Sequence, residues 1–283
     1  MKTKKIDSIA ELRDHAIQAA RMARRAQRQF TYEKRRLKSD KSVLTAVDLR
    51  VERYLNDQIK RMYPEANVVG EETVRSAERS GAYTFVIDPI DGTDVFSQGM
   101  HGWCVAVGLL DEQLLPVAGV VISPRLNLIL FADLGRPATL NGKPLGLERT
   151  SRPRSGGSAG QVDSPFPLPL DSTTNVIANS RVHQCIDLTR YPGKIRSIGS
   201  TSLHICFTLV YPGIYAAIER EGGHVWDIAG AHAILVSHGY ELSYLSGKEL
   251  DYRDLMHGEG TAEPLLAGRP EHVRSLRRAL QGS

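Results

Sequence analysis

The stretch Tyr83-Thr84-Phe85-Val86-Ile87-Asp88-Pro89-Ile90-Asp91-Gly92-Thr93 joins an apolar run to a turn that carries two carboxylates. The aromatic and β-branched residues of its first half predict a strand. Pro89 and Gly92 allow the backbone to turn sharply, so Asp88 and Asp91 can point toward one spot. Carboxylate oxygens are the ligands that Mg²⁺ prefers in its compact octahedral geometry. The stretch therefore predicts a strand that ends in a magnesium site.

The residues around this turn indicate chemistry on a phosphate. Thr93 adds a hydroxyl, and the backbone N–H groups after Gly92 are available to a phosphate oxygen if a helix or tight turn begins there. The acidic pair Glu71-Glu72 lies upstream. Converging carboxylates without a metal would repel one another and raise one another's pKa, so they make little sense as a purely structural element. A metal ion is therefore implied.

Three short motifs follow one another along the chain: Gly70-Glu71-Glu72, Asp88 to Thr93, and Trp226-Asp227-Ile228-Ala229-Gly230. Together they resemble the inositol monophosphatase family, the magnesium-dependent, lithium-sensitive phosphatases of small phosphomonoesters. Weaker similarity runs from Lys38 to Leu265-Leu266-Ala267, so the resemblance covers nearly the whole chain. Three ordered motifs are much more specific than any one of them.

The resemblance implies a role for each motif residue. The ligands of two or three Mg²⁺ ions would be Glu71, Asp88, the carbonyl of Ile90, Asp91 and Asp227, with Asp88 bridging two ions. Water activated by the metal, with Glu71 and Thr93 as the catalytic pair, would attack phosphorus in line without a covalent enzyme intermediate. The implied substrate contacts are Asp91, Gly92, Thr93, Gly199, Ser200, Thr201, Glu219 and Asp227.

Some of these assignments have alternatives. Glu221 competes with Glu219 as the acid that binds a sugar hydroxyl, because the spacing fits neither perfectly. Asp227 taken alone could be a helix N-cap, although the motif around it favours a metal ligand. Asp48, three residues after Thr45, could be the acidic half of a capping box. Since the resemblance places an aspartate here near the metal, we expect Asp48 to do both.

The predicted activity is that of a magnesium-dependent phosphomonoesterase (EC 3.1.3) acting on a small phosphorylated polyol, with inositol-1-phosphate as the first choice. Asp94-Val95-Phe96 stands where inositol-specific members usually carry threonine and asparagine, and the segment from Asp40 to Leu44 also departs from the family pattern. The alternatives within the family are a 3'(2'),5'-bisphosphate nucleotidase, a histidinol-phosphate phosphatase and a fructose-1,6-bisphosphatase. The nucleotidases usually carry lysine at the position of Asp94.

A different class of function remains as an alternative. The net charge is only +4, but basic residues crowd one stretch: Arg21, Arg24, Arg25, Arg28, Lys34, Arg35, Arg36, Lys38 and Lys41. Such a stretch could bind RNA or a partner in a protein that kept the fold without catalysis. No aromatic interleaving or RNA-binding motif accompanies it, so a solvated helix face is the favoured interpretation.

Length and composition fit one globular enzyme. The chain has 283 residues, 41% of them hydrophobic, and no apolar run of 18 residues. The basic N-terminus lacks the apolar segment of a signal peptide, which predicts a cytoplasmic location. Three scattered cysteines indicate neither a disulfide framework nor a metal site. The resemblance implies a homodimer, with no membrane or nucleic-acid partner.

Periodicity predicts the order of the elements. Helical spacing from Ile9 to Ala26 and from Val47 to Met62 precedes strand-like runs at 85–87, 105–110, 117–122 and 128–132. Beyond a Ser-, Gly- and Pro-rich segment we expect strands at 175–178, 214–218, 241–245 and 265–267, and helices at 200–211 and 227–238. This predicts an α/β (α+β) chain with sub-domains 1–149 and 171–283 around a linker at 150–170. The resemblance makes the fold specific as an αβαβα sandwich of the sugar-phosphatase type.

Overall fold

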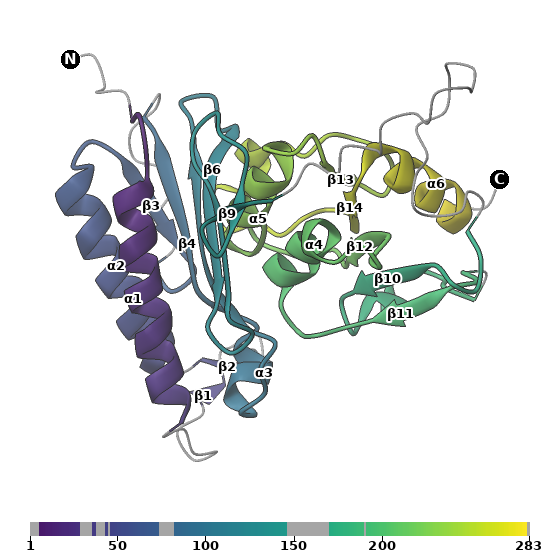
Figure 1. Cartoon of the computed structure of the whole chain (residues 1–283), viewed down its shortest axis with the longest axis horizontal. Coiled ribbons are helices and arrows are strands. Elements are labelled where there is room, and N and C mark those ends of the chain that lie inside the picture. The colour runs from purple at the N-terminus through teal and green to yellow at the C-terminus, as the bar shows by residue number, and fades with distance from the viewer. Residues whose placement is uncertain are drawn as a thin grey trace.

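The fold is a sandwich of five layers in the order helix, sheet, helix, sheet, helix (Figure 1). It is seen in a computed structural model that describes residues 6–28, 36–37, 43–44, 46–73, 82–145, 170–189 and 191–281, with only the backbone described for 36–37 and 43–44. The predicted layered α/β architecture is confirmed. The predicted linker lies outside the described residues except for Leu170, and the division into two sub-domains stays a prediction.

The first layer is a helix pair, α1 (Ala10–Gln27) and α2 (Ala46–Met62), as predicted. Each helix buries one stripe against the sheet, and in α1 that stripe is mostly alanine, which lets the two helices and the sheet approach closely. The arginines of α1 at positions 21, 24 and 25 are exposed, as expected for a solvated face. The side chains of the basic stretch beyond Arg28 lie outside the described residues.

The second layer is a seven-stranded sheet with the order β3-β4-β5-β6-β7-β8-β9. Its strands are β3 (Asn67–Gly70), β4 (Thr84–Asp91), β5 (Cys104–Leu110), β6 (Pro116–Ser123), β7 (Leu128–Ala132), β8 (Thr139–Leu140) and β9 (Lys143–Pro144). β3 runs parallel to β4 and the other neighbours are antiparallel, so the sheet is largely antiparallel. Every residue of β4 is buried, and its pairing with β5 is irregular between Asp88 and Asp91. The bulge turns the strand end toward the site.

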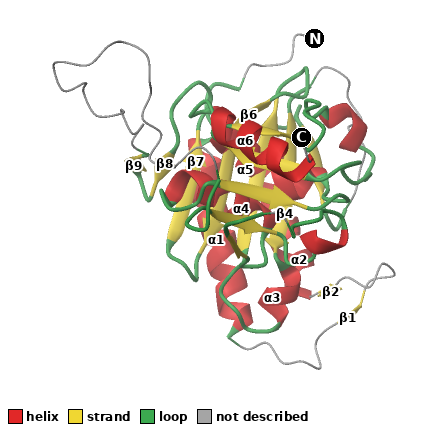
Figure 2. Ribbon diagram, turned by 90° about the vertical axis from the view of Figure 1, so that its right-hand side faces the viewer, coloured by secondary structure: helices red, strands yellow, loops and turns green. Residues whose placement is uncertain are grey.

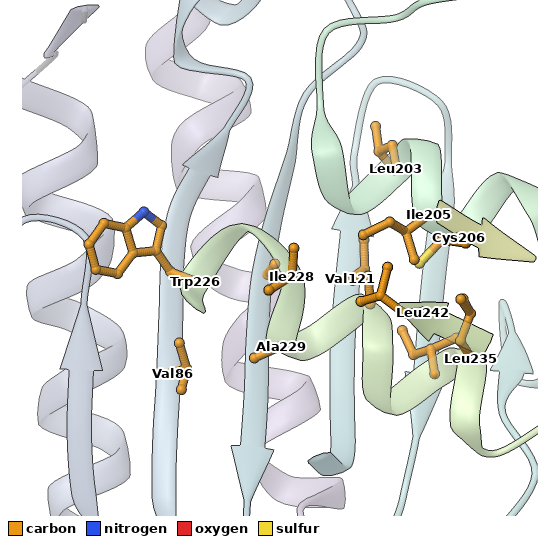
Figure 3. Close-up of a cluster of buried hydrophobic side chains, with 14 of the residues drawn as sticks. Val86, Val121, Leu203, Ile205, Cys206, Trp226, Ile228, Ala229, Leu235 and Leu242 are labelled. Atoms are coloured by element: carbon orange, nitrogen blue, oxygen red, sulfur yellow. The ribbon is translucent and has the colours of Figure 1, made fainter. Parts of the chain in front are cut away.

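The middle layer consists of α4 (Thr201–Val210) and α5 (Val225–Val236), which are buried between the two sheets. α5 lies very close to the first sheet, because a Cβ at Gly119 would stand 2.2 Å from the carbonyl oxygen of Gly230. Figure 3 shows how α4 and α5 pack in one apolar cluster with the first sheet, through Val86, Val121, Leu203, Ile205, Cys206, Ile228, Ala229 and Leu235. This packing fixes where the N-termini of α4 and α5 meet the end of β4.

The fourth layer is a five-stranded sheet with the order β11-β10-β12-β14-β13. Its strands are β10 (Asn175–Ala178), β11 (Lys194–Arg196), β12 (Ala216–Glu219), β13 (Glu241–Tyr244) and β14 (Leu265–Gly268). Helix α6 (Pro270–Gln281) forms the last layer and lies in front of this sheet in Figure 2. Two short 3₁₀ helices cover 182–184 and 252–255.

Several short elements were not predicted by periodicity, because each is too short to show a period. They include the strand pair β1 (Arg36–Leu37) and β2 (Val43–Leu44), the strands β3, β8, β9 and β11, and the five-residue helix α3 (Thr93–Ser97). Two elements begin at other residues than the sequence predicts. β12 begins two residues late, and α5 begins at Val225, so Asp227 lies in the first turn rather than at the N-cap. None of the helices in the described ranges is long and apolar enough to cross a membrane.

Candidate active site

Three carboxylates converge where β4 ends and α5 begins. One oxygen each of Asp88, Asp91 and Asp227 lies within 4.8 Å of the other two. Asp88 and Asp91 are brought there by the bulged end of β4, and Asp227 by the close packing of α5 on the same sheet. Three acidic oxygens at this spacing can share one or more cations. The arrangement is therefore a candidate metal centre.

Asp88 provides the best test of whether a cation fits. Its side chain is 1% exposed, and its Oδ1 atom has no hydrogen-bond partner among the residues that the structure describes. Burial raises the pKa of Asp88 well above 3.8, and the charges of Glu71, Asp91, Asp227 and Asp48 raise it further. A buried carboxylate oxygen with no donor and several like charges nearby is costly unless a cation binds it. Hard oxygen ligands of this kind fit Mg²⁺.

Asp91 differs from Asp88 because α4 supplies it with donors. Its Oδ2 accepts bonds from the Ser200 hydroxyl at 2.8 Å and the Ser202 N–H at 2.6 Å, and its Oδ1 accepts one from the Thr201 N–H at 3.1 Å. Burial raises the pKa of Asp91, whereas these bonds counteract the rise. The N-terminus of a helix favours a negative charge. These donors hold Asp91 in one orientation and favour its charged form, and lone pairs remain for a metal.

Asp227 is not the N-cap of α5, but its carboxylate takes part in the capping of that helix. Its Oδ2 accepts the N–H of His224, the N-cap residue of α5, at 2.6 Å. Burial and the charge of Asp91 raise the pKa of Asp227 well above 3.8, while the bond from His224 lowers it. The cap uses one of the two carboxylate oxygens, so a contribution to the metal centre is compatible with it. Trp226 is buried and stacks on His224 beside the site, with ring centroids 4.7 Å apart.

Glu71 lies directly after β3, next to the strand that carries Asp88. Its N–H continues the parallel ladder by donating to the Ile87 carbonyl at 3.3 Å. Glu71 does not belong to the set of three converging carboxylates, yet its charge is the largest influence on the pKa of Asp88 after burial. The structure therefore places this predicted ligand and base at the edge of the metal centre.

Thr93 and Ile90 are coupled to each other. The Thr93 hydroxyl donates to the Ile90 carbonyl at 2.8 Å. Its only hydrogen is used in this bond, so the Thr93 oxygen can act toward a water only as an acceptor. The Ile90 carbonyl retains a second lone pair that a metal can bind. Gly92, with φ 91°, permits the turn between them, and α3 begins at Thr93.

The predicted substrate loop 199–201 touches the turn after β4. Gly199 has φ 103°, and its carbonyl oxygen is 3.0 Å from the position of a Cβ on Gly92. Ser200 is buried, and its hydroxyl oxygen caps α4 by accepting the Leu203 N–H. Its hydroxyl hydrogen is donated to Asp91, so Ser200 lies behind this carboxylate. Thr201 lines the cleft next to the carboxylates. The three predicted substrate residues therefore occupy different surroundings.

A cleft of about 300 Å³ opens beside Asp227. It is lined by Asn179, Thr201, Glu219, Arg220, Glu221, Gly222, Gly223, Asp227, Ile228 and Leu265. Both candidate acids are at the cleft, Glu219 buried and Glu221 exposed. Arg220 is the one cationic side chain in this lining, and no hydrogen bond or ion pair joins it to another described residue. The cleft thus offers both acceptors and one cation to a ligand.

His204, on α4, is a site residue that the sequence analysis missed. Its Nε2 accepts the N–H groups of Ile198 at 3.1 Å and Gly199 at 3.4 Å, so its proton must be on Nδ1, which donates to Glu219 at 2.7 Å. Glu219 also accepts the Thr201 hydroxyl at 3.3 Å. Burial raises the pKa of Glu219, and the contact with His204 lowers it. A histidine within an apolar helix gives no signal in the sequence that would distinguish this role.

Asp48 and Glu52 lie one helical turn apart on α2, both buried toward the site. Asp48 is among the charges that raise the pKa of Asp88, which agrees with the expected supporting place beside the metals. Glu52 accepts the Glu72 N–H at 2.7 Å and the Thr73 hydroxyl. Its pKa is raised by burial, although the bond from Thr73 lowers it. In the sequence, Glu52 could have been recognised by its position four residues after Asp48 on the same face of a predicted helix.

Comparison with known proteins identifies the family. The profile described as the inositol monophosphatase family matches residues 4–280. Inositol monophosphatase 2 of Solanum lycopersicum is 30% identical over 85% of this chain and 90% of its own, and inositol monophosphatase 1 of Sus scrofa is 28% identical over 87% of both. The crystal structure of extragenic suppressor protein suhB from Bartonella henselae has a TM-score of 0.75 at 18% identity, covering 95% of this chain and 96% of that one.

The family match also decides between the two classes of function left open by the sequence. Members of this family are phosphomonoesterases that depend on metal ions, and the described carboxylates form a cluster that can hold such ions. The non-catalytic binding module is therefore set aside, and the reactant is a small phosphorylated compound. The chain belongs to the inositol monophosphatase family and is a phosphoric monoester hydrolase.

Proposed function

We propose that the protein hydrolyses the phosphomonoester of a small polyol with Mg²⁺, and that inositol-1-phosphate is its first candidate substrate. The observation that carries this proposal is the buried Asp88 oxygen without a donor, facing two further carboxylates beside an open cleft. Relatives named inositol monophosphatase at 28–30% identity support the substrate class. So does a solved relative in the fold, SaIMPase-II with bound inositol monophosphate, with a TM-score of 0.69.

The proposed metal ligands are Glu71, Asp88, Asp91, Asp227 and the carbonyl of Ile90. Magnesium supplies positive charge to the phosphoryl oxygens and lowers the pKa of a water molecule. The chain contributes the geometry. α4 orients Asp91 by three hydrogen bonds, and the His224 N–H orients Asp227, so these carboxylates are held in place before any ion arrives.

Thr93 and Glu71 are the proposed catalytic pair. Because the Thr93 hydroxyl donates to Ile90, its oxygen accepts a hydrogen bond from the attacking water and orients it. Glu71 then accepts the proton of that water, as a general base. Attack on phosphorus from the side opposite the leaving oxygen needs no covalent enzyme intermediate. The N–H groups around Gly92 and Thr93 would hold a phosphate oxygen.

The rest of the substrate would lie in the cleft. Glu219 and Thr201 line it, and Glu219 is kept as an acceptor by the neutral His204. A carboxylate of this kind favours a hydroxyl donor, as a polyol provides. Glu221 lies at the same cleft, exposed, and stays the alternative acid. The dimer, the third ion, lithium sensitivity and the cytoplasmic location stay predictions.

A second candidate substrate class has a specific observation in its favour. Arg220 lines the cleft without an ion-pair partner among the described residues, and a guanidinium binds phosphate well. A substrate with a second phosphate, such as adenosine 3',5'-bisphosphate, would use it. SaIMPase-II has also been solved with bound 2'AMP, at a TM-score of 0.66. Asp94, where nucleotidases usually carry lysine, argues against this class.

Phosphate release from a substrate panel tests the proposal. The panel contains inositol-1-phosphate, adenosine 3',5'-bisphosphate, fructose-1,6-bisphosphate and histidinol phosphate, each with Mg²⁺ and with a chelator. Wild type is compared with Asp88→Asn and with a control variant, Asp57→Asn. The control removes an exposed carboxylate on α2, away from β4. We expect magnesium-dependent release from inositol-1-phosphate that only Asp88→Asn abolishes. A dominant second substrate would replace the polyol assignment, and release that persists in chelator would refute the metal mechanism.

A further inference from the structure

Glu52 is a buried carboxylate that the mechanism above does not use. It lies on α2 and is only 2% exposed, and no ion pair neutralises it among the described residues. Its two oxygens instead accept the backbone N–H of Glu72 at 2.7 Å and the hydroxyl of Thr73. Burying a carboxylate is costly. The cost is offset here by bonds to the loop that follows Glu71, so Glu52 holds that loop.

The two peptide units that flank Glu71 are therefore fixed from opposite sides. The unit before it is fixed by the Glu71 N–H, which donates to the Ile87 carbonyl of β4. The unit after it is fixed by the Glu72 N–H, which donates to Glu52. Peptide units are planar, so fixing both leaves little freedom for φ and ψ of Glu71. The direction of its Cα–Cβ bond is fixed with them.

Gly70 makes the approach of Glu52 possible. A Cβ on Gly70 would stand 2.4 Å from Cδ, 2.5 Å from Oε1 and 2.7 Å from Oε2 of Glu52. The Glu52 carboxyl thus occupies the volume that any other side chain at position 70 would need. Gly70 needs no left-handed backbone conformation here, since it is not among the glycines with positive φ. The space for Glu52 is the structural reason for a glycine at this position.

Register places the held residue at the metal centre. Gly70 pairs with Ile87 in the parallel ladder. The residues that come next, Glu71 and Asp88, therefore lie side by side at the same end of two adjacent strands. We propose that Glu52, accommodated by Gly70, is a positioning residue that directs the Glu71 carboxylate toward Asp88 and the metal it binds. The inference rests on the proposed function, because it takes Glu71 as metal ligand and base.

Substitutions on α2 test this role. In Glu52→Ala the loop loses both acceptors, whereas Glu52→Gln retains one carbonyl oxygen and should fall between Ala and wild type. We expect kcat for Glu52→Ala to fall roughly 10- to 100-fold, the loss that a misplacement of about 1 Å causes. KM should change little. Binding of Mn²⁺, followed by its electron paramagnetic resonance signal without substrate, should weaken several-fold.

Two controls on the same helix separate positioning from general stability. Asp57→Asn removes an exposed charge, and Ile59→Val shortens a buried side chain about two turns along α2 from Glu52. Ile59→Val should lower Tm without changing kcat or Mn²⁺ affinity. If Glu52→Ala and Glu52→Gln leave kcat and Mn²⁺ affinity like those of Ile59→Val, the positioning role is refuted. If Glu52→Ala does not fold, Glu52→Gln and the single variant Gly70→Ala decide.

A double-mutant cycle examines the pair directly. Gly70→Ala should lower kcat and Mn²⁺ affinity in the wild-type background, since the new methyl displaces the Glu52 carboxyl. In the Glu52→Ala background the space is empty, so Gly70→Ala should add little. Additive losses, or a harmless Gly70→Ala, would overturn the proposal. A wild-type protein without magnesium-dependent phosphatase activity would refute the proposed function instead, whereas an active wild type with an unaffected Glu52→Gln refutes only the positioning role.

Discussion

The two sheets contribute to the active site in different ways. The seven-stranded sheet supplies Glu71 and Asp88 from adjacent ends of the parallel strands β3 and β4, with Asp91 after the bulge. The half that contains the five-stranded sheet supplies Asp227 from α5 and the cleft residue Glu219 from β12. In the first group Asp88 and Asp91 are buried and Glu71 is half-buried, whereas Asp227 and Glu219 border the cleft. We infer that the first sheet supplies most of the groups for the reaction, and that the second half, apart from Asp227, supplies the groups that select the substrate.

The largest effect is expected at the first sheet. Asp88→Asn should lower kcat at least about 10³-fold, because it removes the charge of a carboxylate that we propose as a metal ligand. Mg²⁺ should no longer raise Tm. Phosphate-release kinetics and thermal unfolding at several Mg²⁺ concentrations measure both effects. A variant that keeps a tenth of the wild-type kcat would contradict the assignment of the reaction to this sheet.

The same carboxylate should make the metal-free protein sensitive to pH. Burial and Glu71 raise the pKa of Asp88 above 3.8, so between 3.8 and the raised value the native state retains a proton that the unfolded chain has lost. The stability from this group is fully present below 3.8 and is lost as the pH rises through the raised pKa. Without metal, Asp88→Asn should therefore gain stability relative to wild type as the pH rises above 3.8. We expect a difference in Tm of about 2 °C or more once the pH exceeds the raised pKa.

The difference between the two proteins isolates this effect. His232 is buried and its pKa is lowered to about 4, so its contribution changes with pH in the opposite direction. It titrates in both proteins and cancels when their Tm values are subtracted. Saturating Mg²⁺ should reverse the order, with wild type the more stable. A Tm difference that does not depend on pH would show that Asp88 is not a strained carboxylate in the metal-free protein.

The contrast between the two halves also explains how much the sequence could predict. Asp88 and Asp91 are close to the end of a strand that the local pattern predicts, whereas Glu71 follows β3, a strand that periodicity did not predict, and was found through its motif. The bonds from Ser200 and Ser202 to Asp91 link residues 109 and 111 positions apart, so only the packing of α4 against the first sheet creates them. Long-range hydrogen bonds leave no local pattern.

The same reasoning applies to single elements that differ from expectation. α5 begins at Val225, because His224 takes the N-cap position and Asp227 bonds back to its N–H. A helix start depends on which backbone donors find a partner, which composition alone does not specify. His204 stands among apolar residues of α4, and its partners Glu219 and Ile198 come from a strand and a loop. Such a contact cannot be predicted before the fold is known.

Smaller effects are expected at the cleft. Glu219→Gln should raise KM for inositol-1-phosphate about tenfold with kcat changed by less than about threefold, the scale of one bond to a charged group. Glu221→Gln, at the exposed acid of the same cleft, should change KM less. Steady-state kinetics of both variants decide between the two acids. A larger effect at Glu221 would exchange their roles, and a large fall in kcat at Glu219 would remove the separation between the two halves.

The smallest effect is expected at Arg220, and it depends on the substrate. Its guanidinium is half-exposed next to the charged Glu221, so its attraction for a second anionic group is screened by salt. Arg220→Ala should raise KM for adenosine 3',5'-bisphosphate up to about tenfold at low salt and less at high salt, because a guanidinium pairs with phosphate. KM for inositol-1-phosphate should stay within about twofold of wild type, because that substrate has only the phosphate bound at the metal centre. Arg21→Ala, an exposed arginine on α1 in the first layer, is the matched control. Equal losses on both substrates would mean that Arg220 acts on the reacting phosphate, and the second half would then contribute to the reaction through more than Asp227.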